Sequence, residues 1–147
     1  MPLAVAMLAT AAVADSDFGA RVGLYTKHGQ PYFGAEGVIP IGGTLGGTFA
    51  ANPNFEYVRL GDIQEFTFNA DFTYGRPIKG RSRGWVGVGI GLLSSHPDGP
   101  AEPSTNDGVG NIFLGIGFET GIGIPYITAK YVTKTHPEFL LGLGMRF

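Results

Sequence analysis

The sequence contains no cysteine and few charged residues. Without thiols, the chain can form no disulfide, no thiolate zinc site and no cysteine nucleophile. Charged residues make up 15% of the chain, against about 25% in an average soluble domain. The formal net charge of −2 and the isoelectric point near 5.8 provide no basic surface for nucleic acid. These absences remove whole classes of function without selecting one.

Glycine and apolar residues, by contrast, are abundant in the chain. The chain has 25 glycines among 147 residues, about 17% against an average near 7%. Hydrophobic residues make up 44% of the chain, which excludes a collagen-like or a disordered polypeptide. The length fits one domain, and no linker or repeat suggests a second one.

The first 14 residues form an apolar run that we separate from the folded domain. The run ends in Ala12-Val13-Ala14, the small-x-small pattern that precedes a signal-peptidase site. It is shorter than the ~20 residues that a membrane-spanning helix needs. Its usual basic start is missing, so we expect a truncated signal peptide over 1–14 and a single domain over 15–147. The alternative is a short hydrophobic helix packed on the core.

From Asp15 onward, apolar and polar residues alternate with period two, which is typical of β-strands. The segment 65–74 is the clearest case. Because successive strand side chains point to opposite faces, one face carries Phe66, Phe68, Ala70, Phe72 and Tyr74. The opposite face carries Glu65, Thr67, Asn69, Asp71 and Thr73.

Similar alternation predicts eight antiparallel strands joined as one meander. We expect them at 17–27, 31–41, 45–60, 64–75, 83–94, 109–120, 123–133 and 137–147. Most are ten or more residues long, enough for a tilted strand to cross a membrane. The predicted fold is all-β, a closed eight-stranded antiparallel up-and-down transmembrane β-barrel.

Two closed β-architectures are compatible with this pattern. A soluble lipocalin-like barrel turns its apolar face inward around a ligand, whereas a membrane barrel turns that face toward lipid. The surface of a soluble barrel should be rich in lysine and glutamate. Here the polar face is mostly glycine, threonine and asparagine with scattered charge, and inward glycines would leave room for large side chains such as Trp85. The pattern therefore favours the membrane barrel, with the lipocalin-like barrel as an alternative.

The last strand resembles the closing strand of bacterial outer-membrane proteins. The segment 139–147, FLLGLGMRF, ends in an aromatic residue and places apolar residues at alternate positions. The segment 52–58, NPNFEYV, followed by the alternating strand at 65–74, is also similar to small OmpA-like or opacity-like eight-stranded barrels. The resemblance implies that the barrel-assembly machinery engages an assembly signal made of Phe139, Leu141, Leu143, Met145 and Phe147.

The resemblance also implies a topology in the bacterial outer membrane. Both termini would be periplasmic, and the connections near 28–30, 61–63, 95–108 and 134–137 would face outward. The connections near 42–44, 76–83 and 121–122 would face the periplasm. The basic 76–83 segment is expected to be a solvated turn whose cations meet anionic lipid headgroups; a docking site for an acidic partner is the alternative.

Alternation places an unusual set of charged residues inside the predicted barrel. Because buried charges are costly unless they are paired, the first interpretation is a structural plug of ion pairs. The alternative is a narrow or gated ion path, although eight strands normally enclose only side chains. The predicted network consists of Arg21, Glu36, Glu56, Glu65, Asp71, Lys130 and Arg146, with Asn52, Asn54 and Asn69 beside it.

Motifs for catalysis or metal binding are weak. All three histidines, His28, His96 and His136, fall in or beside predicted outer loops near Asp98 and Glu138, but their spacing matches no metal site. The stretch from Ser94 to Asp98 contains the residue types of a hydrolase triad, too close together on one strand to act as one. The glycines at 87, 89 and 91 lack the other elements of a phosphate loop.

We therefore expect a non-enzymatic outer-membrane barrel without metal or cofactor. Its expected role is structural or surface-interacting, through outer loops whose partner the sequence does not identify. The competing functions are a narrow pore or transporter for ions or small apolar molecules, and a soluble ligand-binding barrel. Outer-membrane lipids are the expected surroundings.

Overall fold

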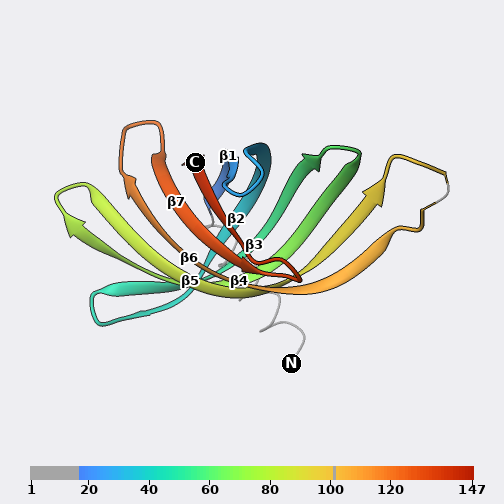
Figure 1. Cartoon of the computed structure of the whole chain (residues 1–147). Helices are drawn as coiled ribbons and strands as arrows, with labels where there is room; N and C mark the ends of the chain where they lie inside the picture. The colour runs from blue at the N-terminus through green and yellow to red at the C-terminus, as the bar shows by residue number, and fades with distance from the viewer. Residues whose placement is uncertain (1–16, 101) are drawn as a thin grey trace, which may run out of the picture.

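A computed structural model describes residues 17–100 and 102–147, so the predicted signal peptide lies outside the described residues. The described chain folds into eight β-strands (Figure 1). Their bounds are β1 Asp17–Tyr25, β2 Gln30–Thr44, β3 Gly47–Leu60, β4 Ile63–Lys79, β5 Ser82–Pro97, β6 Thr105–Phe118, β7 Ile124–Thr133 and β8 Glu138–Arg146.

Each strand pairs antiparallel with the next one along the chain, and β1 pairs with β8 to close the barrel. The closing ladder runs from Gly19, opposite Arg146, to Tyr25, opposite Leu140. Beyond it, the backbones of Phe18 and Phe147 exchange two hydrogen bonds. The predicted closed eight-stranded antiparallel barrel is confirmed. None of the described residues forms a helix long and apolar enough to cross a membrane.

The barrel has two ends with different connections. One end, here called the terminus end, holds the start of β1, the end of β8 and the connections 45–46, 80–81 and 119–123. The other, here called the loop end, holds the connections 26–29, 61–62, 98–104 and 134–137. In Figure 1, the terminus-end hairpins lie to the left, and the β5–β6 connection extends to the right.

Three predicted connections prove shorter, because strand pairing continues into them. The predicted turn at 42–44 is wrong: Gly42 and Gly43 still pair with β3. Most of the predicted 76–83 turn is also strand, since Arg76 pairs with Gly84 across β4 and β5. The predicted 95–108 loop shrinks to 98–104 for the same reason. Polar and glycine-rich residues suggested loops at these positions. The strands nevertheless continue through them, because backbone pairing does not require apolar side chains.

The β2–β3 turn consists of Leu45 and Gly46, both with positive φ, at 53° and 75°. A two-residue hairpin turn of this kind matches the twist of the flanking strands. Glycine adopts such angles freely, whereas leucine does so at a steric cost. The Leu45 side chain also stands almost fully in the open, with 84% of its surface exposed.

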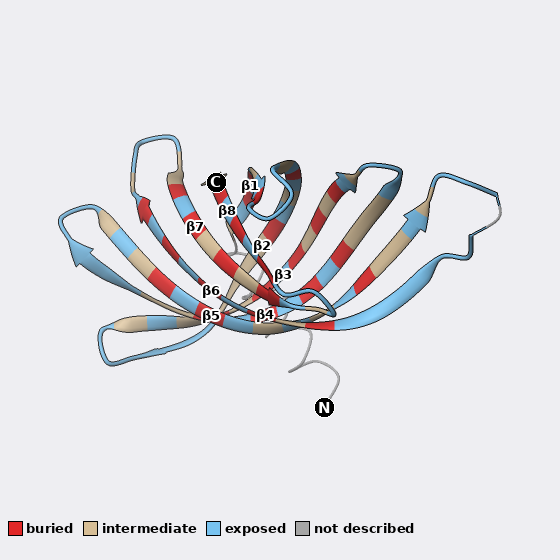
Figure 2. Ribbon diagram, viewed as in Figure 1, coloured by how far each residue is buried: buried red, intermediate tan, exposed pale blue. Residues whose placement is uncertain are grey.

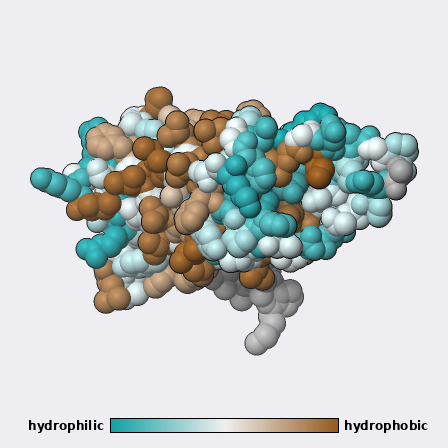
Figure 3. Space-filling model, viewed as in Figure 1, coloured by the Kyte–Doolittle hydropathy of each residue, from teal (hydrophilic) through white to brown (hydrophobic). Residues whose placement is uncertain are grey.

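Burial alternates along the strands (Figure 2). The outward residues are mostly apolar, whereas the inward ones are charged and amide residues, glycines and two groups of buried aromatic and aliphatic residues. Figure 3 shows brown apolar side chains gathered over the left and middle of the view, with hydrophilic ones toward the β5–β6 connection. A soluble barrel would bury this face, so the observed orientation is opposite to the lipocalin-like alternative. The outward residues include Phe18, Val22, Leu24, Phe33, Phe68, Phe72, Val86, Val88, Ile90, Leu92, Ile112, Leu114, Ile116, Phe118, Ile127, Phe139, Leu141, Leu143 and Phe147.

Inward glycines stand opposite bulky side chains on the neighbouring strand. Trp85 faces Gly115 and Phe113 faces Gly87 in the β5–β6 ladder, and in each pair a Cβ on the glycine would overlap the ring. Because a narrow barrel has little interior space, each large side chain occupies the volume that its glycine partner leaves free. This pairing fills the barrel with side chains.

Candidate functional site: the barrel interior

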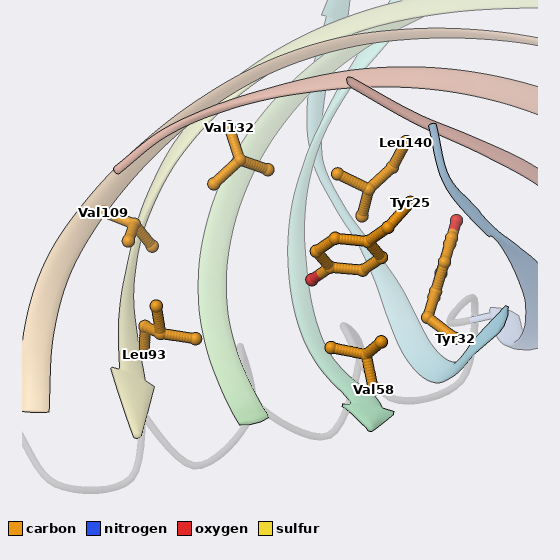
Figure 4. Close-up of a cluster of buried hydrophobic side chains, with 7 residues drawn as sticks. All are labelled: Tyr25, Tyr32, Val58, Leu93, Val109, Val132 and Leu140. Carbon is orange, nitrogen blue, oxygen red and sulfur yellow. The ribbon is translucent and has the colours of Figure 1, made fainter. Parts of the chain in front are cut away.

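An apolar layer crosses the barrel near the loop end. Its side chains come from seven strands, all but β4, and point toward one another (Figure 4). The rings of Tyr25 and Tyr32 meet edge to face, with 5.7 Å between their centroids. Leu60 packs against the layer from the loop side. The buried members are Tyr25, Tyr32, Val58, Leu93, Val109, Val132 and Leu140.

Beneath this layer, Glu56 binds two cations from different strands. Arg21 Nη2 lies 2.6 Å from one Glu56 carboxylate oxygen, and Lys130 Nζ lies 3.1 Å from both oxygens. All three side chains are at most 5% exposed. Since a buried ion is costly unless it is paired and hydrogen-bonded, this triad joins β1, β3 and β7 through one carboxylate.

Amides connect the triad to a second carboxylate. Arg21 donates to Asn54 Oδ1 at 2.8 Å, while Asn54 Nδ2 donates to Asp71 at 2.7 Å. Asn111 also donates to Asp71, at 2.9 Å, and Asn69 donates to Asn54 at 3.0 Å. Among the described residues, Asp71 has amide donors but no cation within salt-bridge distance.

Toward the terminus end, Arg146 joins a carboxylate to an aromatic cluster. Its Nε donates to Glu36 at 2.8 Å, and Nη2 donates to the other Glu36 oxygen at 3.3 Å. The guanidinium lies over the Trp85 ring, 4.1 Å from the centroid, and 5.0 Å from that of Tyr126. Asn52 donates to Glu36 at 3.0 Å. A cation stacked on aromatic faces and held by a carboxylate is well fixed.

The central charges balance. Arg21, Lys130 and Arg146 supply three positive charges, and three carboxylates, Glu36, Glu56 and Asp71, oppose them. Arg21 also lies 3.5 Å from Glu36, which links the two ion-pair groups. The arrangement is a neutral, hydrogen-bonded filling between strands.

Glu65 does not join this network. Its side chain lies at the loop end, where it accepts from Lys134 at 3.2 Å. Lys134 also lies 3.4 Å from Glu138, whose other oxygen is 2.8 Å from His28 Nδ1. The alternation gave Glu65 its inward direction, but its distance along β4 from the central carboxylates separates it from them.

A cavity opens at each end of the barrel. The loop-end cavity has a volume of about 380 Å³ and is lined by Lys27, His28, Leu60, Glu65, Leu93, Ser95, Asp107, Lys134, Thr135 and His136. The terminus-end cavity has a volume of about 760 Å³, with Trp85 and Arg146 among its lining residues. The apolar layer, the ion pairs and the aromatic cluster all lie between these two cavities.

His96 and the serine-rich segment form no catalytic triad, and the described residues offer no metal site. No three His, Asp or Glu side chains there are placed to hold a metal ion. The His96 ring packs against Phe66, with 5.7 Å between centroids, whereas Ser95 lines the loop-end cavity. Asp98 pairs with Arg59 and accepts from Gln64 at 2.9 Å, so no nucleophile–base–orienter geometry exists among these residues.

Sequence reasoning missed three interior residues that take part in these contacts. Asn111 lies at an inward position of β6 and donates to Asp71, and the alternation of that strand could have identified it. Glu138 is 2% exposed at the start of β8, on the inward face of that strand, so the alternation of the predicted strand 137–147 could have identified it too. Tyr126 on β7 packs against Trp85 on β5, with 5.4 Å between the ring centroids. A contact between nonadjacent strands cannot be predicted from a local sequence pattern.

No protein-family model and no curated protein matches the sequence. Solved structures match its fold. The N-terminal β-barrel domain of Pseudomonas aeruginosa OprF superposes with a TM-score of 0.68 at 12% identity, covering 90% of this chain and 96% of that one. Neisserial surface protein A gives 0.61 at 11% identity, over 89% and 92% of the two chains. The outer-membrane enzyme PagL gives 0.59 at 14% identity, over 89% and 98%.

The chain therefore has the fold of the small eight-stranded outer-membrane β-barrels, as its closing strand and alternation predicted. The fold carries no single activity, because one of the similar structures is an enzyme.

Proposed function

We propose that the chain is a non-enzymatic outer-membrane protein with a closed interior, acting through the surface of its loop end. The location is supported by the apolar outer face, since an apolar surface this extended marks a membrane or protein interface. The structural neighbours and the alternating closing strand support it further. In this arrangement, both termini are periplasmic and the loop end faces outward.

One observation carries the closed-interior proposal: a neutral ion-pair network and an apolar layer lie between the two end cavities. A conducting path would need continuous hydrated space along the axis, and eight strands rarely leave it. The buried partners on separate strands make the network a support for the barrel wall. The loop end is left as the surface for contacts outside the membrane.

The charge of the loop end gives that surface its character. Four exposed carboxylates and two exposed cations stand there, which leaves a formal surface charge of 2 − 4 = −2. We infer that the loop end meets its partner as an acidic, hydrated surface. Its groups are Asp62, Asp98, Glu102 and Asp107 against Lys27 and Arg59, whereas Glu65, Lys134 and Glu138 pair with one another in the interior.

The non-enzymatic part of the proposal is supported by the positions of the candidate groups. Ser95, His96 and Asp98 contact different partners and do not converge. A triad needs the nucleophile, the base and its orienting group within hydrogen-bond reach of one another.

The first experiment compares boiled and unboiled cell-envelope samples on an SDS gel. A closed membrane barrel resists SDS until it is heated, so the band should shift and the protein should be absent from the soluble fraction. Soluble protein without a heat shift would contradict the location.

Single-channel recording then tests the closed interior. Purified protein and its Arg146→Ala variant are inserted into planar bilayers, with heat-shifted protein as the control for folding. We expect no discrete channel from either, and a lower stability for the variant. A large new conductance in Arg146→Ala would mean that this residue holds a path shut.

A narrow pore is the second candidate function. It is favoured by the two cavities, which enter the barrel from both ends and leave only the middle layers closed. Discrete conductance from the unmodified protein would support the pore and overturn the closed interior.

A further inference from the structure

The terminus-end cavity has the size and lining of a small-molecule site. Its volume of about 760 Å³ falls within the roughly 300–1,000 Å³ typical of ligand pockets. Glycines at 43, 46, 47 and 75 contribute backbone to its wall. Apolar surface comes from Val38, Pro40, Ala50, Pro77, Trp85 and Ile124.

Arginines supply most of the charge in this cavity. Arg76, Arg83 and Arg146 line it, against one carboxylate, that of Asp17. Arg76 has no ion pair with any described residue. Arg83 is half exposed in a surface pair with Glu119, at 2.6 Å, a type of pair that contributes little to stability and is readily exchanged.

Arg146 is held in an orientation that suits the binding of a further anion at the inner end of the cavity. Glu36 occupies its Nε and Nη2, while a guanidinium carries five N–H donors on three nitrogens. The Trp85 ring beneath it and the Glu36 carboxylate beside it fix its orientation. Its remaining donors therefore stand in a fixed place without the entropy cost of ordering a free arginine.

We propose that this cavity binds a small organic carboxylate that carries an apolar body. Guanidinium groups match the planar geometry of a carboxylate and bind it through paired charge-assisted hydrogen bonds. Arg76 and Arg83 bind the carboxylate at the mouth or draw it inward toward Arg146, and the apolar body packs against Trp85, Ile124 and Pro40. The inference does not depend on whether the barrel conducts.

The single tryptophan of the chain makes the test direct. Because Trp85 is the only tryptophan and lines the cavity, a heavy-atom ligand bound there quenches the whole tryptophan signal by contact. The folded protein in an uncharged detergent is titrated with 4-iodobenzoate, and separately with neutral 4-iodobenzamide and cationic 4-iodobenzylammonium. We expect saturable quenching by the carboxylate and only weak, linear quenching by the other two.

Two matched double variants separate a site from general attraction. Arg76→Gln with Arg83→Gln removes two cavity cations, and Lys79→Gln with Arg81→Gln removes two from the same hairpin that do not line the cavity. The first should weaken binding about tenfold or more, since it removes charge-assisted hydrogen bonds. The second should leave binding within about twofold, with the heat shift on SDS gels as the folding control for both.

Each outcome of these titrations either supports the carboxylate site or overturns it. Equal weakening in the two double variants would mean general electrostatic attraction, and equal quenching by all three probes would mean partition into detergent. Either result, or no saturable quenching by 4-iodobenzoate, overturns the site. A channel in planar bilayers would overturn the closed interior and leave this result unchanged, so the two proposals fail separately.

Discussion

Gly115 lies directly opposite Trp85 in the β5–β6 ladder, and the indole covers the position that a side chain at 115 would take. The same relation recurs around the barrel between glycines and large inward side chains. The interior is therefore packed by pairs in which one strand supplies volume and its neighbour supplies space. Other such pairs include Gly87 with Phe113, Gly144 with Tyr126, Gly23 with Tyr32 and Gly89 with Asp71.

Substitution of Gly115 by alanine should destabilise the barrel. The new Cβ would overlap the Trp85 ring, and overpacking of this kind costs about 1–3 kcal/mol. Urea unfolding of refolded protein, followed by the fluorescence of Trp85, measures the change in the free energy of unfolding.

Gly108→Ala is the matched control for Gly115→Ala. Gly108 lies on the same strand, and a Cβ there would meet nothing within 4 Å. We expect its effect to be within about 0.5 kcal/mol of zero. Equal unfolding midpoints for the two variants would refute the packing argument.

Removal of Arg21 should cost far more than removal of an exposed arginine. Arg21→Met leaves Glu56 buried with Lys130 as its only cation, and breaking a buried pair typically costs about 3–5 kcal/mol. Arg59→Met breaks a pair whose arginine side chain is 56% exposed, where about 0–1 kcal/mol is expected. Urea midpoints of both variants should differ accordingly, and similar midpoints would show that the buried triad contributes no more than a surface pair.

Alternation explains why so much of the barrel could be predicted from the sequence. Period two sets the face of every side chain, so the inward direction of Arg21, Glu56 and Lys130 followed once a membrane barrel was assumed. The ends of the strands were harder to predict from the sequence. Gly42 and Gly43 suggested a turn by composition, yet they stay in the ladder because backbone pairing does not need large side chains.

Partners across the barrel could not be read from local patterns. Glu56 contacts Lys130 over 74 residues of chain, and the alternation gives only the face of each residue. Their meeting depends on the closure of the sheet and on the stagger of its strands. The same limit explains Glu65, which faces inward but lies at the level of Lys134 near the loop end.

Replacement of Leu45 by glycine should stabilise the β2–β3 hairpin. Leu45 has a φ of 53°, an angle that glycine adopts without steric cost, and its side chain is too exposed to contribute packing. The substitution relieves about 1–2 kcal/mol of steric cost and adds about 0.5–1 kcal/mol of conformational entropy cost. We therefore expect a net gain of about 0.5–1 kcal/mol in the free energy of unfolding. Gly46→Ala, at a φ of 75°, should change stability in the opposite direction, and a loss of stability in Leu45→Gly would show that the leucine makes a contact of its own.

Phe147 should matter for assembly of the barrel in the cell and little for its stability. Phe147 exposes 68% of its surface, and its contacts with Phe18 are backbone hydrogen bonds at 2.7 and 3.2 Å that a substitution leaves in place. Phe147→Ala should therefore refold in detergent with a nearly unchanged urea midpoint. If the closing strand is the assembly signal, the same variant should show much less heat-shifted barrel in the cell envelope.

Phe33→Ala is the control for this comparison, because Phe33 is also outward-facing, with 57% of its surface exposed, on a strand away from the chain terminus. Both variants lose one lipid-facing ring, so any effect of membrane contact alone should be equal in the two. A selective loss of the folded band in Phe147→Ala assigns the terminal ring to recognition during assembly. Equal envelope levels would mean that the terminal ring acts only as one more apolar surface residue.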